Sequence, residues 1–325
     1  MNSSMDAGVF QQTCDAIKAQ IGHVLLGQED VVDQVLVAVL ARGHVLIEGV
    51  PGLGKTLLVR VLSQVLGCQS RRIQFTPDLM PSDVTGGNVY NQQTARFEFN
   101  QGPVFTQLLL ADEINRATAK TQSALLEAMQ ERSVTVDGAT RALPRPFFVL
   151  ATQNPVESQG TYPLPEAQLD RFMLKVNVDH PTKKVELRIL ENYARGFDPS
   201  DLEGAGLQQV VDAEGVRVLQ DAARMVRIEA DVLQYIVEIV TGTRSHRALE
   251  LGASPRASIA LLQAGRVRAA MEGRDFVIPD DVKSLAAAIL RHRVILHPDA
   301  EFEGLTADDI VREVVEATPV PKAAG

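Results

Sequence analysis

Short apolar runs alternate with amphipathic stretches through the first half of the chain. Residues 44–48 predict a buried strand, and residues 56–66 place leucine and valine on one helical face. Further apolar runs that predict strands lie at residues 72–75, 108–111, 147–152 and 172–178. Strands separated by helical stretches are typical of a parallel sheet covered on both faces. The pattern therefore predicts an α/β core.

Two stretches interrupt this alternation and predict hairpins. Residues 88–99 alternate apolar and polar side chains, which is the period of a strand. Residues 133–143 contain Asp137 and Gly138, a pair that suits a two-residue hairpin turn because both positions tolerate positive φ. We interpret both stretches as insertions in the α/β core.

The chain changes character after Pro181, where helical patterns replace the apolar strands and no further strand is predicted. Four helical patterns lie at residues 213–225, 229–242, 256–271 and 279–290. Residues 196–206 are rich in Gly, Pro and Asp, which is typical of a linker. The expected organisation is a frayed extension (1–20), an α/β core (21–190), a linker (191–206), an all-helical domain (207–318) and a tail (319–325).

Composition narrows the class of protein. The chain has 325 residues, which suits one large domain or two ordinary ones, and its 32 Lys and Arg against 41 Asp and Glu give a net charge of −9. An acidic chain is poorly suited to sequence-independent duplex binding. Two cysteines are too few for a disulfide framework or a four-cysteine zinc site. Without a signal-like start or an apolar run near the roughly 18 residues of a membrane span, we expect a cytoplasmic protein that is not inserted in a membrane.

Residues 49–56 read Gly-Val-Pro-Gly-Leu-Gly-Lys-Thr and lie between a predicted strand and a predicted helix. Glycines let the backbone curl so that N–H groups face phosphate oxygens, and the helix N-terminus adds positive charge. Lys55 is expected to reach the β- and γ-phosphates and Thr56 to bind Mg²⁺. A plain tight turn is the alternative, which the match at eight positions disfavours. The expected binding residues are Gly49, Pro51, Gly52, Leu53, Gly54, Lys55, Thr56 and Leu57.

The apolar run at 108–111 ends in Asp112 and Glu113. Ligands of open α/β sheets bind at the carboxyl edge, so these carboxylates are placed for chemistry. Asp112 is expected to hold Mg²⁺, and Glu113 to polarise the attacking water as a general base. The alternative is a solvated strand end, which the phosphate-binding loop 112 − 55 = 57 residues earlier disfavours.

Three further polar residues are candidates for phosphate contact. Asn154 follows the predicted strand at 147–152, where its amide can bond the γ-phosphate or the water; an ordinary turn asparagine is the alternative. Arg171 lies just before the last predicted strand. Arg256 lies in the first turn of a predicted helix that Ser254 caps. A cation is unfavourable there because the helix N-terminus is itself positive, so its presence suggests a role such as contact with phosphate. For either arginine the alternative is a surface ion pair. We interpret residues 291–293, Arg-His-Arg, as a solvated helix end.

The order of these motifs resembles the MoxR family of AAA+ ATPases, within the clade that carries a hairpin insert in its second helix. The runs that carry the resemblance are the phosphate-binding loop, Asp-Glu-Ile-Asn-Arg-Ala (112–117), Ala-Thr-Gln-Asn-Pro (151–155), Pro-Glu-Ala-Gln-Leu-Asp-Arg-Phe (165–172) and Ser-Pro-Arg (254–256). The resemblance extends from about residue 21 to residue 310. It implies an AAA+ P-loop parallel sheet core with hairpin inserts, followed by an all-helical lid domain.

The resemblance also implies roles at the phosphates. Lys55 and Thr56 match the Walker A pair, and Asp112 and Glu113 match the Walker B pair. Asn154 matches sensor 1. These residues imply a site for ATP and Mg²⁺ that catalyses ATP hydrolysis.

A second group of implied roles lies farther from the loop. Gly27 and Gln28 match a segment that packs on adenine. Arg171 resembles the arginine finger that reaches a neighbouring subunit, although Arg116 is an alternative for that contact. Arg256 resembles sensor 2, acting within its own subunit.

Members of the family assemble into rings, and the resemblance implies a hexamer. It also implies chaperone-like work such as metal-centre insertion or complex assembly. The resemblance implies a protein client, for example one with a von Willebrand factor A domain. This chain has no Asp-x-Ser-x-Ser motif, so such a domain must belong to another protein. The alternatives are a nucleic-acid motor, which the acidic balance disfavours, and a nucleotide-gated scaffold, which Glu113 disfavours.

Overall fold

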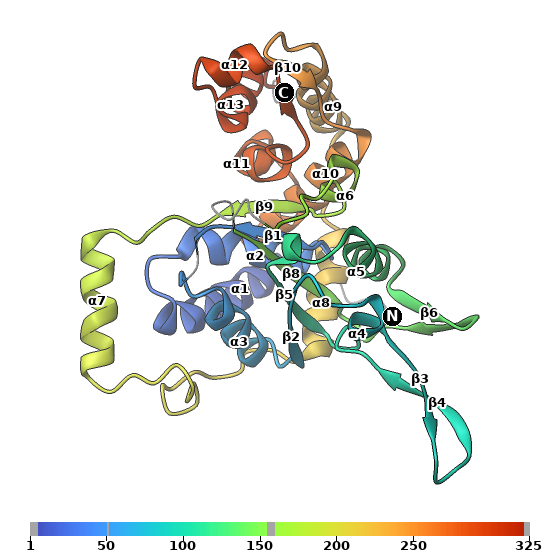
Figure 1. Cartoon of the computed structure of the whole chain (residues 1–325). Helices are drawn as coiled ribbons and strands as arrows, with labels where there is room; N and C mark the ends of the chain where they lie inside the picture. Colours follow the sequence, from blue (N-terminus) through green and yellow to red (C-terminus); the bar gives the residue numbers. More distant parts are fainter. Residues whose placement is uncertain (1–5, 51, 155–159, 322–325) are drawn as a thin grey trace.

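The computed structural model describes residues 6–50, 52–154 and 160–321 (Figure 1). Within these residues a five-stranded sheet forms the centre of the first domain, with strand order β2-β5-β8-β1-β9 and every strand pair parallel. Its strands are β1 (Val45–Glu48), β2 (Ser70–Gln74), β5 (Leu108–Asp112), β8 (Phe148–Gln153) and β9 (Leu174–Asn177). The predicted α/β core and its parallel sheet are confirmed.

The sheet is the middle of three layers, because its side chains alternate between two faces. On β1, Val45 and Ile47 join one apolar cluster and Leu46 joins the other. The first face is covered by α1 (Ala7–Val24), α2 (Glu29–Leu40) and α3 (Lys55–Val65), and the second by α4 (Pro81–Thr85) and α5 (Ala119–Glu131). Burial on both faces explains why the strands are continuous apolar runs.

The N-terminal region differs from the prediction. Residues 1–20 were expected to fray, but α1 begins at Ala7, and the Asp6 side chain caps it by accepting a hydrogen bond from the Gly8 amide (3.1 Å). Phe10, Cys14 and Ile17 are buried on one helical face. That apolar stripe packs on α3 and on a helix of the second domain, so burial holds the segment in place.

Both predicted hairpins are present as insertions beside the sheet (Figure 1). The first pairs β3 (Gly86–Asn91) with β4 (Arg96–Gln101). The second pairs β6 (Ser133–Val136) with β7 (Ala139–Ala142). Asp137 (φ 50°) and Gly138 (φ 78°) form its turn, as their sequence indicates.

After β9 the chain forms α7 (Lys183–Ala194), which lies apart from the sheet on the left of Figure 1. This helix runs past residue 191, where the linker was expected to begin, and Leu202 within the predicted linker is buried. The second domain contains α8 (Ala213–Arg224), α9 (Ala230–Ser245), α10 (Pro255–Met271), α11 (Pro279–Leu290), α12 (Pro298–Phe302) and α13 (Ala307–Ala317).

The second domain is not purely helical. The short strands β10 (Leu249–Leu251) and β11 (Ile295–Leu296) pair antiparallel. With three and two residues, these strands are too short to show the alternation that identifies a strand in a sequence. Short helical turns, α6 (Glu166–Leu169) in the first domain and a 3₁₀ turn at Ile114–Arg116, were likewise not predicted.

One apolar core joins the two domains. Buried residues of α1 and α2 belong to the same cluster as those of α8, α10 and α11. The second domain is therefore fixed against the first face of the sheet. Within the described residues, no helix combines the length and the apolar character needed to span a membrane.

Candidate functional site

The glycine-rich loop connects the carboxyl end of β1 to the first turn of α3. Gly52 (φ +86°) and Gly54 (φ +76°) adopt the left-handed backbone that side chains rarely tolerate, and Gly54 caps α3. The Lys55 ammonium donates a hydrogen bond to the Gly49 carbonyl, so it lies over the loop. Pro51, one of the predicted binding residues, lies outside the described residues. The loop therefore has the backbone of an anion-binding turn at a helix N-terminus.

The predicted acids lie within electrostatic reach of this loop. Burial lowers the pKa of Lys55, while the charges of Asp112, Glu113 and Glu48 raise it. Thr56 follows in the first turn of α3 and is exposed. The structure thus brings together the residues that the sequence assigned to the β- and γ-phosphates.

Asp112 ends β5 and is held by both neighbouring strands. Its Oδ1 accepts a hydrogen bond from Thr152 Oγ1 at 2.6 Å, and its Oδ2 accepts from Arg72 Nη2 at 2.7 Å. Arg72 lies on β2 and was not identified from the sequence, because its contact depends on β2 pairing with β5. The two partners orient this carboxylate at the sheet edge.

Glu113 has a strained backbone and a fixed side chain. Its φ of 56° is unusual for a residue with a side chain, and its amide donates to Thr152 Oγ1 at 2.8 Å. The carboxylate accepts hydrogen bonds from Gln74 Nε2 (3.0 Å) and Arg116 Nη1 (2.9 Å). Arg116 is therefore paired with an acid of its own subunit. Gln74, the last residue of β2, was not identified from the sequence.

Asn154 lies between the acids and the loop. It is buried and directly follows β8, the strand between β5 and β1 in the sheet. An amide at this position faces the same edge as both sets of residues. The predicted place of Asn154 agrees with the topology.

Thr56 and Asp112 provide a hydroxyl and a carboxylate, which are the hard oxygen donors that Mg²⁺ prefers. Within the described residues, no group of three or more His, Cys, Asp and Glu side chains has the arrangement of a metal site. A two-donor set fits Mg²⁺, because this ion keeps several waters and takes its remaining ligands from phosphates. When bound, it would neutralise charge on the phosphate oxygens.

A cavity of about 420 Å³ lies beside the loop. It is lined by residues 24–31, by the loop with Leu57, by residues 177–182 and by the inner face of α7. Gln28 Nε2 donates to the Leu53 carbonyl at 2.9 Å, and a side chain at Gly27 would meet Val185 of α7 at 2.6 Å. The volume suits a small organic ligand, so Gly27 and Gln28 lie where a nucleotide base would bind. The contribution of α7 was not predicted.

The two predicted arginines lie at the other edge of the sheet. Arg171 precedes β9, and Met173 donates its amide to the carbonyl of His44, the residue before β1. Residues that precede parallel strands share the amino edge, whereas the glycine-rich loop follows β1. The four residues of β1 separate these edges by roughly 13 Å, at about 3.3 Å per residue.

Arg256 belongs to this amino edge as well. Ser254 Oγ, the cap of α10, donates to Asp170 Oδ2 at 2.9 Å, and Arg256 Nη1 lies 3.9 Å from the same oxygen. This position, away from the loop of the same subunit, does not fit the expectation that Arg256 acts within its own subunit. The reason is that α10 docks against the amino edge, which the sequence of α10 alone does not reveal.

Asp170 also binds Arg293, which fixes the second domain to this edge. Arg293 Nε donates to Asp170 Oδ1 at 2.7 Å, and its Nη2 donates to the Phe172 carbonyl at 2.6 Å. The side chain of Arg293 is only 3% exposed, and His292 is buried against the same carbonyl. The interpretation of residues 291–293 as a solvated helix end is wrong at these two positions. Arg171 and Arg256 line one cavity at this edge, and Arg256 is half exposed.

Comparison with known proteins agrees with the two-domain organisation of the structure. The model of the ATPase family associated with various cellular activities matches residues 44–174, and an AAA lid domain model matches residues 241–314. The chain is 51% identical to the uncharacterized protein YeaC of Bacillus subtilis, over 93% of this chain and 92% of the relative. It is 41% identical to the chaperone MoxR1 of Mycobacterium tuberculosis (93% and 81% covered) and 31% identical to protein MoxR of Methylorubrum extorquens (93% and 93%). A crystal structure from Cytophaga hutchinsonii, provisionally assigned as an ATPase, is similar with a TM-score of 0.89 and 39% identity over 97% of both chains.

Proposed function

Since the chain belongs to the MoxR family of AAA+ ATPases, we propose that it hydrolyses ATP in a ring of identical subunits and couples turnover to remodelling of protein partners. A hexamer is the ring we expect, and metal-centre insertion or complex assembly are the kinds of work we expect it to support. The name of the relative chaperone MoxR1 supports the chaperone-like part.

One observation carries the proposal: the catalytic groups of one subunit lie at opposite edges of its sheet. Lys55, Asp112 and Glu113 lie at the carboxyl edge, and the arginines of that edge are paired with the acids, Arg72 with Asp112 and Arg116 with Glu113. Arg171 and Arg256 lie together at the amino edge. A complete site therefore forms when the amino edge of one subunit meets the carboxyl edge of the next.

The chemistry follows from this division. The loop amides and Lys55 hold the β- and γ-phosphates, and Asn154 positions the attacking water with Glu113, which accepts its proton. Gln74 and Arg116 both donate to Oε2 of Glu113, so they hold the carboxylate in place while its other oxygen, Oε1, accepts the hydrogen bond from the water. The neighbour's Arg171 and Arg256 stabilise the charge that develops in the transition state. Mg²⁺ supplies charge neutralisation on the phosphates when it is bound.

A site shared by two subunits also explains how turnover does mechanical work. Loss of the γ-phosphate removes a contact that spans the interface, so the relative position of the two subunits changes with the nucleotide. The client would be a separate protein, with a von Willebrand factor A domain as one expected form. A nucleic-acid client is disfavoured by the net charge of −9.

Mixing two inactive variants tests the shared site. Lys55→Ala removes the phosphate contact and leaves Arg171, whereas Arg171→Ala does the reverse. In a 1:1 mixture about a quarter of the interfaces combine an intact loop with an intact arginine, so about a quarter of wild-type turnover should return. Specific activity of the wild type should rise and then saturate with protein concentration.

The matched control mixes Lys55→Ala with Glu113→Gln. Both changes damage the carboxyl edge of the same subunit, so no interface in this mixture is complete and no activity should return. Recovery in the control, or failure of Lys55→Ala and Arg171→Ala to complement, would contradict the shared site. Wild-type protein that binds ATP but never turns it over would favour a nucleotide-gated scaffold.

A further inference from the structure

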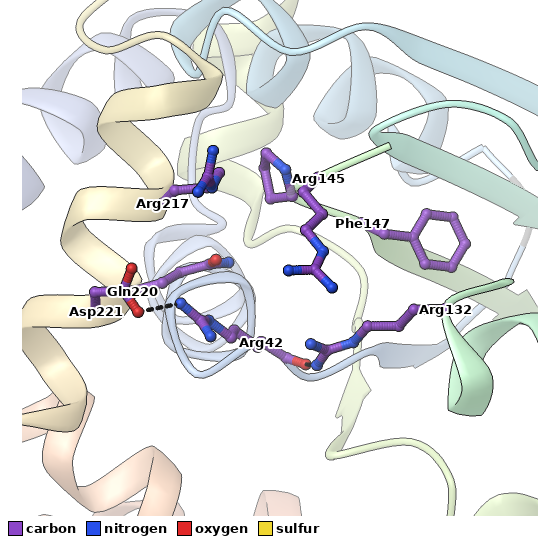
Figure 2. Close-up of a pocket in the computed structure, with 8 residues that line it drawn as sticks. Arg42, Arg132, Arg145, Phe147, Arg217, Gln220 and Asp221 are labelled. Atoms are coloured by element: carbon purple, nitrogen blue, oxygen red, sulfur yellow. Dashed lines mark hydrogen bonds and ion pairs between the residues drawn. The ribbon is translucent and has the colours of Figure 1, made fainter. Parts of the chain in front are cut away.

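A second cavity, of about 200 Å³, lies at the amino edge of the sheet and is lined mainly by arginine (Figure 2). Arg42 follows α2, Arg132 follows α5, Arg145 precedes β8, and Arg217 lies on α8. Figure 2 shows the side chains of Arg132 and Arg145 extending into the same space, whereas the side chain of Arg42 points toward Asp221. The cavity thus gathers cations from four segments that are far apart in the sequence.

The acids around this cavity do not balance its arginines. Asp221 is the one acidic side chain of the lining, and it pairs with Arg42. Arg217 pairs with Glu214 on its own helix, at 2.6 Å. In the part of the chain that the structure describes, neither Arg132 nor Arg145 has an ion-pair partner; Arg132 instead donates to the Arg42 carbonyl.

The environment of Arg132 shows the resulting excess of positive charge. Burial lowers the pKa of Arg132, and the charges of Arg42, Arg145 and Arg224 lower it further. The guanidinium still remains charged, so like charges are held close together. An adjoining cavity, also lined by Arg42 and Arg132, adds Arg224 and Arg266 and no acid. In a chain of net charge −9, this concentration of arginine is a local feature that an anion would relieve.

The backbone at two of these arginines supports a role for their side chains. Arg42 (φ 60°) and Arg132 (φ 51°) both adopt the left-handed conformation, which glycine would adopt at lower cost. Each lies just beyond the end of a helix, where glycine is common. Both strained positions carry arginine, and both side chains line one cavity. This combination indicates a functional role for the two cations.

We propose that this arginine cluster binds the phosphate or diphosphate group of a small molecule. Guanidinium groups bind phosphate through paired, charge-assisted hydrogen bonds, and several such groups converge here. The cavity is smaller than the roughly 300–1,000 Å³ of pockets that enclose drug-sized ligands, so it suits a phosphate group rather than a whole organic molecule. Since the lining joins the sheet edge to α8, the bound anion ties the second domain to the core.

Calorimetric titration with inorganic pyrophosphate tests the site on the full chain. Lys55→Ala is used as the background, so that the contribution of the glycine-rich loop to pyrophosphate binding is reduced. Adding Arg145→Gln and Arg217→Gln should weaken pyrophosphate binding at least tenfold, because two charge-assisted contacts are lost. Pyrophosphate should also raise the melting temperature of the Lys55→Ala background and not that of the arginine variants.

Arg312→Gln on α13 is the matched control, since Arg312 is exposed and pairs with Asp309 three residues away, as Arg217 does with Glu214. It should bind pyrophosphate like the background. Should the double variant fail to fold, as judged by circular dichroism, Arg145→Lys keeps the charge, removes the paired donors and should still weaken binding.

Three results would overturn the proposal. The first is no pyrophosphate binding by the Lys55→Ala background, or binding that the arginine variants leave unchanged. The second is tighter, arginine-dependent binding of a short single-stranded DNA, which would assign the cluster to nucleic acid. The third is loss of pyrophosphate binding on assembly into oligomers, which would assign the cluster to carboxylates of a neighbouring subunit.

Discussion

The two edges of the central sheet have opposite chemistry. At the carboxyl edge each acid has a cation beside it: Asp112 with Arg72 at 2.7 Å and Glu113 with Arg116 at 2.9 Å. At the amino edge arginines gather around few acids, so that Asp170 alone lies near both Arg256 and Arg293. The carboxyl edge, where acids and cations are paired, is suited to hold a nucleotide with Mg²⁺. The amino edge, where arginines outnumber acids, is suited to contact phosphate groups. This difference between the edges is what the proposed shared site requires, because a neighbour's arginines would face the phosphates held by the loop.

Arg171→Ala is the substitution that should separate the two edges most clearly. If Arg171 completes a neighbour's site, turnover should fall about 10³–10⁵-fold, as for other arginine fingers. Nucleotide binding by the loop of the same subunit should not change, which a fluorescent ATP analogue measures. Arg312→Ala is the control. Weakened nucleotide binding with unchanged assembly would place Arg171 at its own subunit's loop and contradict the division of roles between the two edges.

Glu113→Gln probes the opposite edge. Loss of the general base should lower turnover about 10²–10⁴-fold, while ATP stays bound because Lys55 and the loop are intact. Single-turnover assays and retention of bound ATP on a filter measure the two effects. Glu131→Gln, an exposed acid at the end of α5, should have no effect. Full activity in Glu113→Gln would remove this residue from the mechanism.

Arg293→Met tests whether the amino edge is held together by its buried ion pair. The Asp170 side chain is only 15% exposed, so removing the cation leaves a largely buried carboxylate without its closest partner. This should lower the free energy of unfolding by about 3–5 kcal/mol. Urea denaturation measures this value, and the exposed Arg312→Met should cost far less. Since Asp170 also positions Ser254, turnover should fall together with stability. A change below about 1 kcal/mol would show that the pair does not fix the second domain.

The buried His44 should make the amino edge sensitive to acid. Its Nδ1 accepts a hydrogen bond from the Val149 amide at 3.0 Å, and burial, followed by the charge of Arg132, lowers its pKa to about 4. The unfolded chain binds a proton near pH 6.5, so the folded state is favoured fully above that pH and loses the advantage between pH 6.5 and about 4. The loss should be on the order of 3 kcal/mol. Below pH 4 this histidine should have no further effect.

Free energies of unfolding measured from pH 7.5 to pH 4 test this predicted loss of stability at acidic pH. His44→Asn should flatten the dependence, and the exposed His23→Asn should leave it unchanged. A buried His292, whose pKa burial also lowers, contributes equally to both variants. An unchanged slope in His44→Asn would show that other groups cause the acid sensitivity.

The glycine-rich loop, the acids at the end of β5 and the hairpin turn at Asp137 were predictable because each depends on a few consecutive residues. The α1 helix was missed although its signal is present: Phe10, Cys14 and Ile17 recur at helical spacing. Its stability depends on the partners it packs against, which come from α3 and the second domain. An amphipathic stripe predicts a helix, and only the packing shows that the helix is held.

The glycine-rich loop and the two acids of the carboxyl edge could be predicted because each depends on contiguous residues, whereas Arg72 and Gln74 reach the acids only through the pairing of β2 with β5. Tertiary structure alone decided which residues meet at the amino edge. Arg256 lies at the amino edge because α10 docks on Asp170. The cavity lined by Arg42, Arg132, Arg145 and Arg217 forms only because α2, α5, β8 and α8 converge. Electrostatic contacts act over a few ångströms, and the chain brings such distant residues together only through burial of its apolar core.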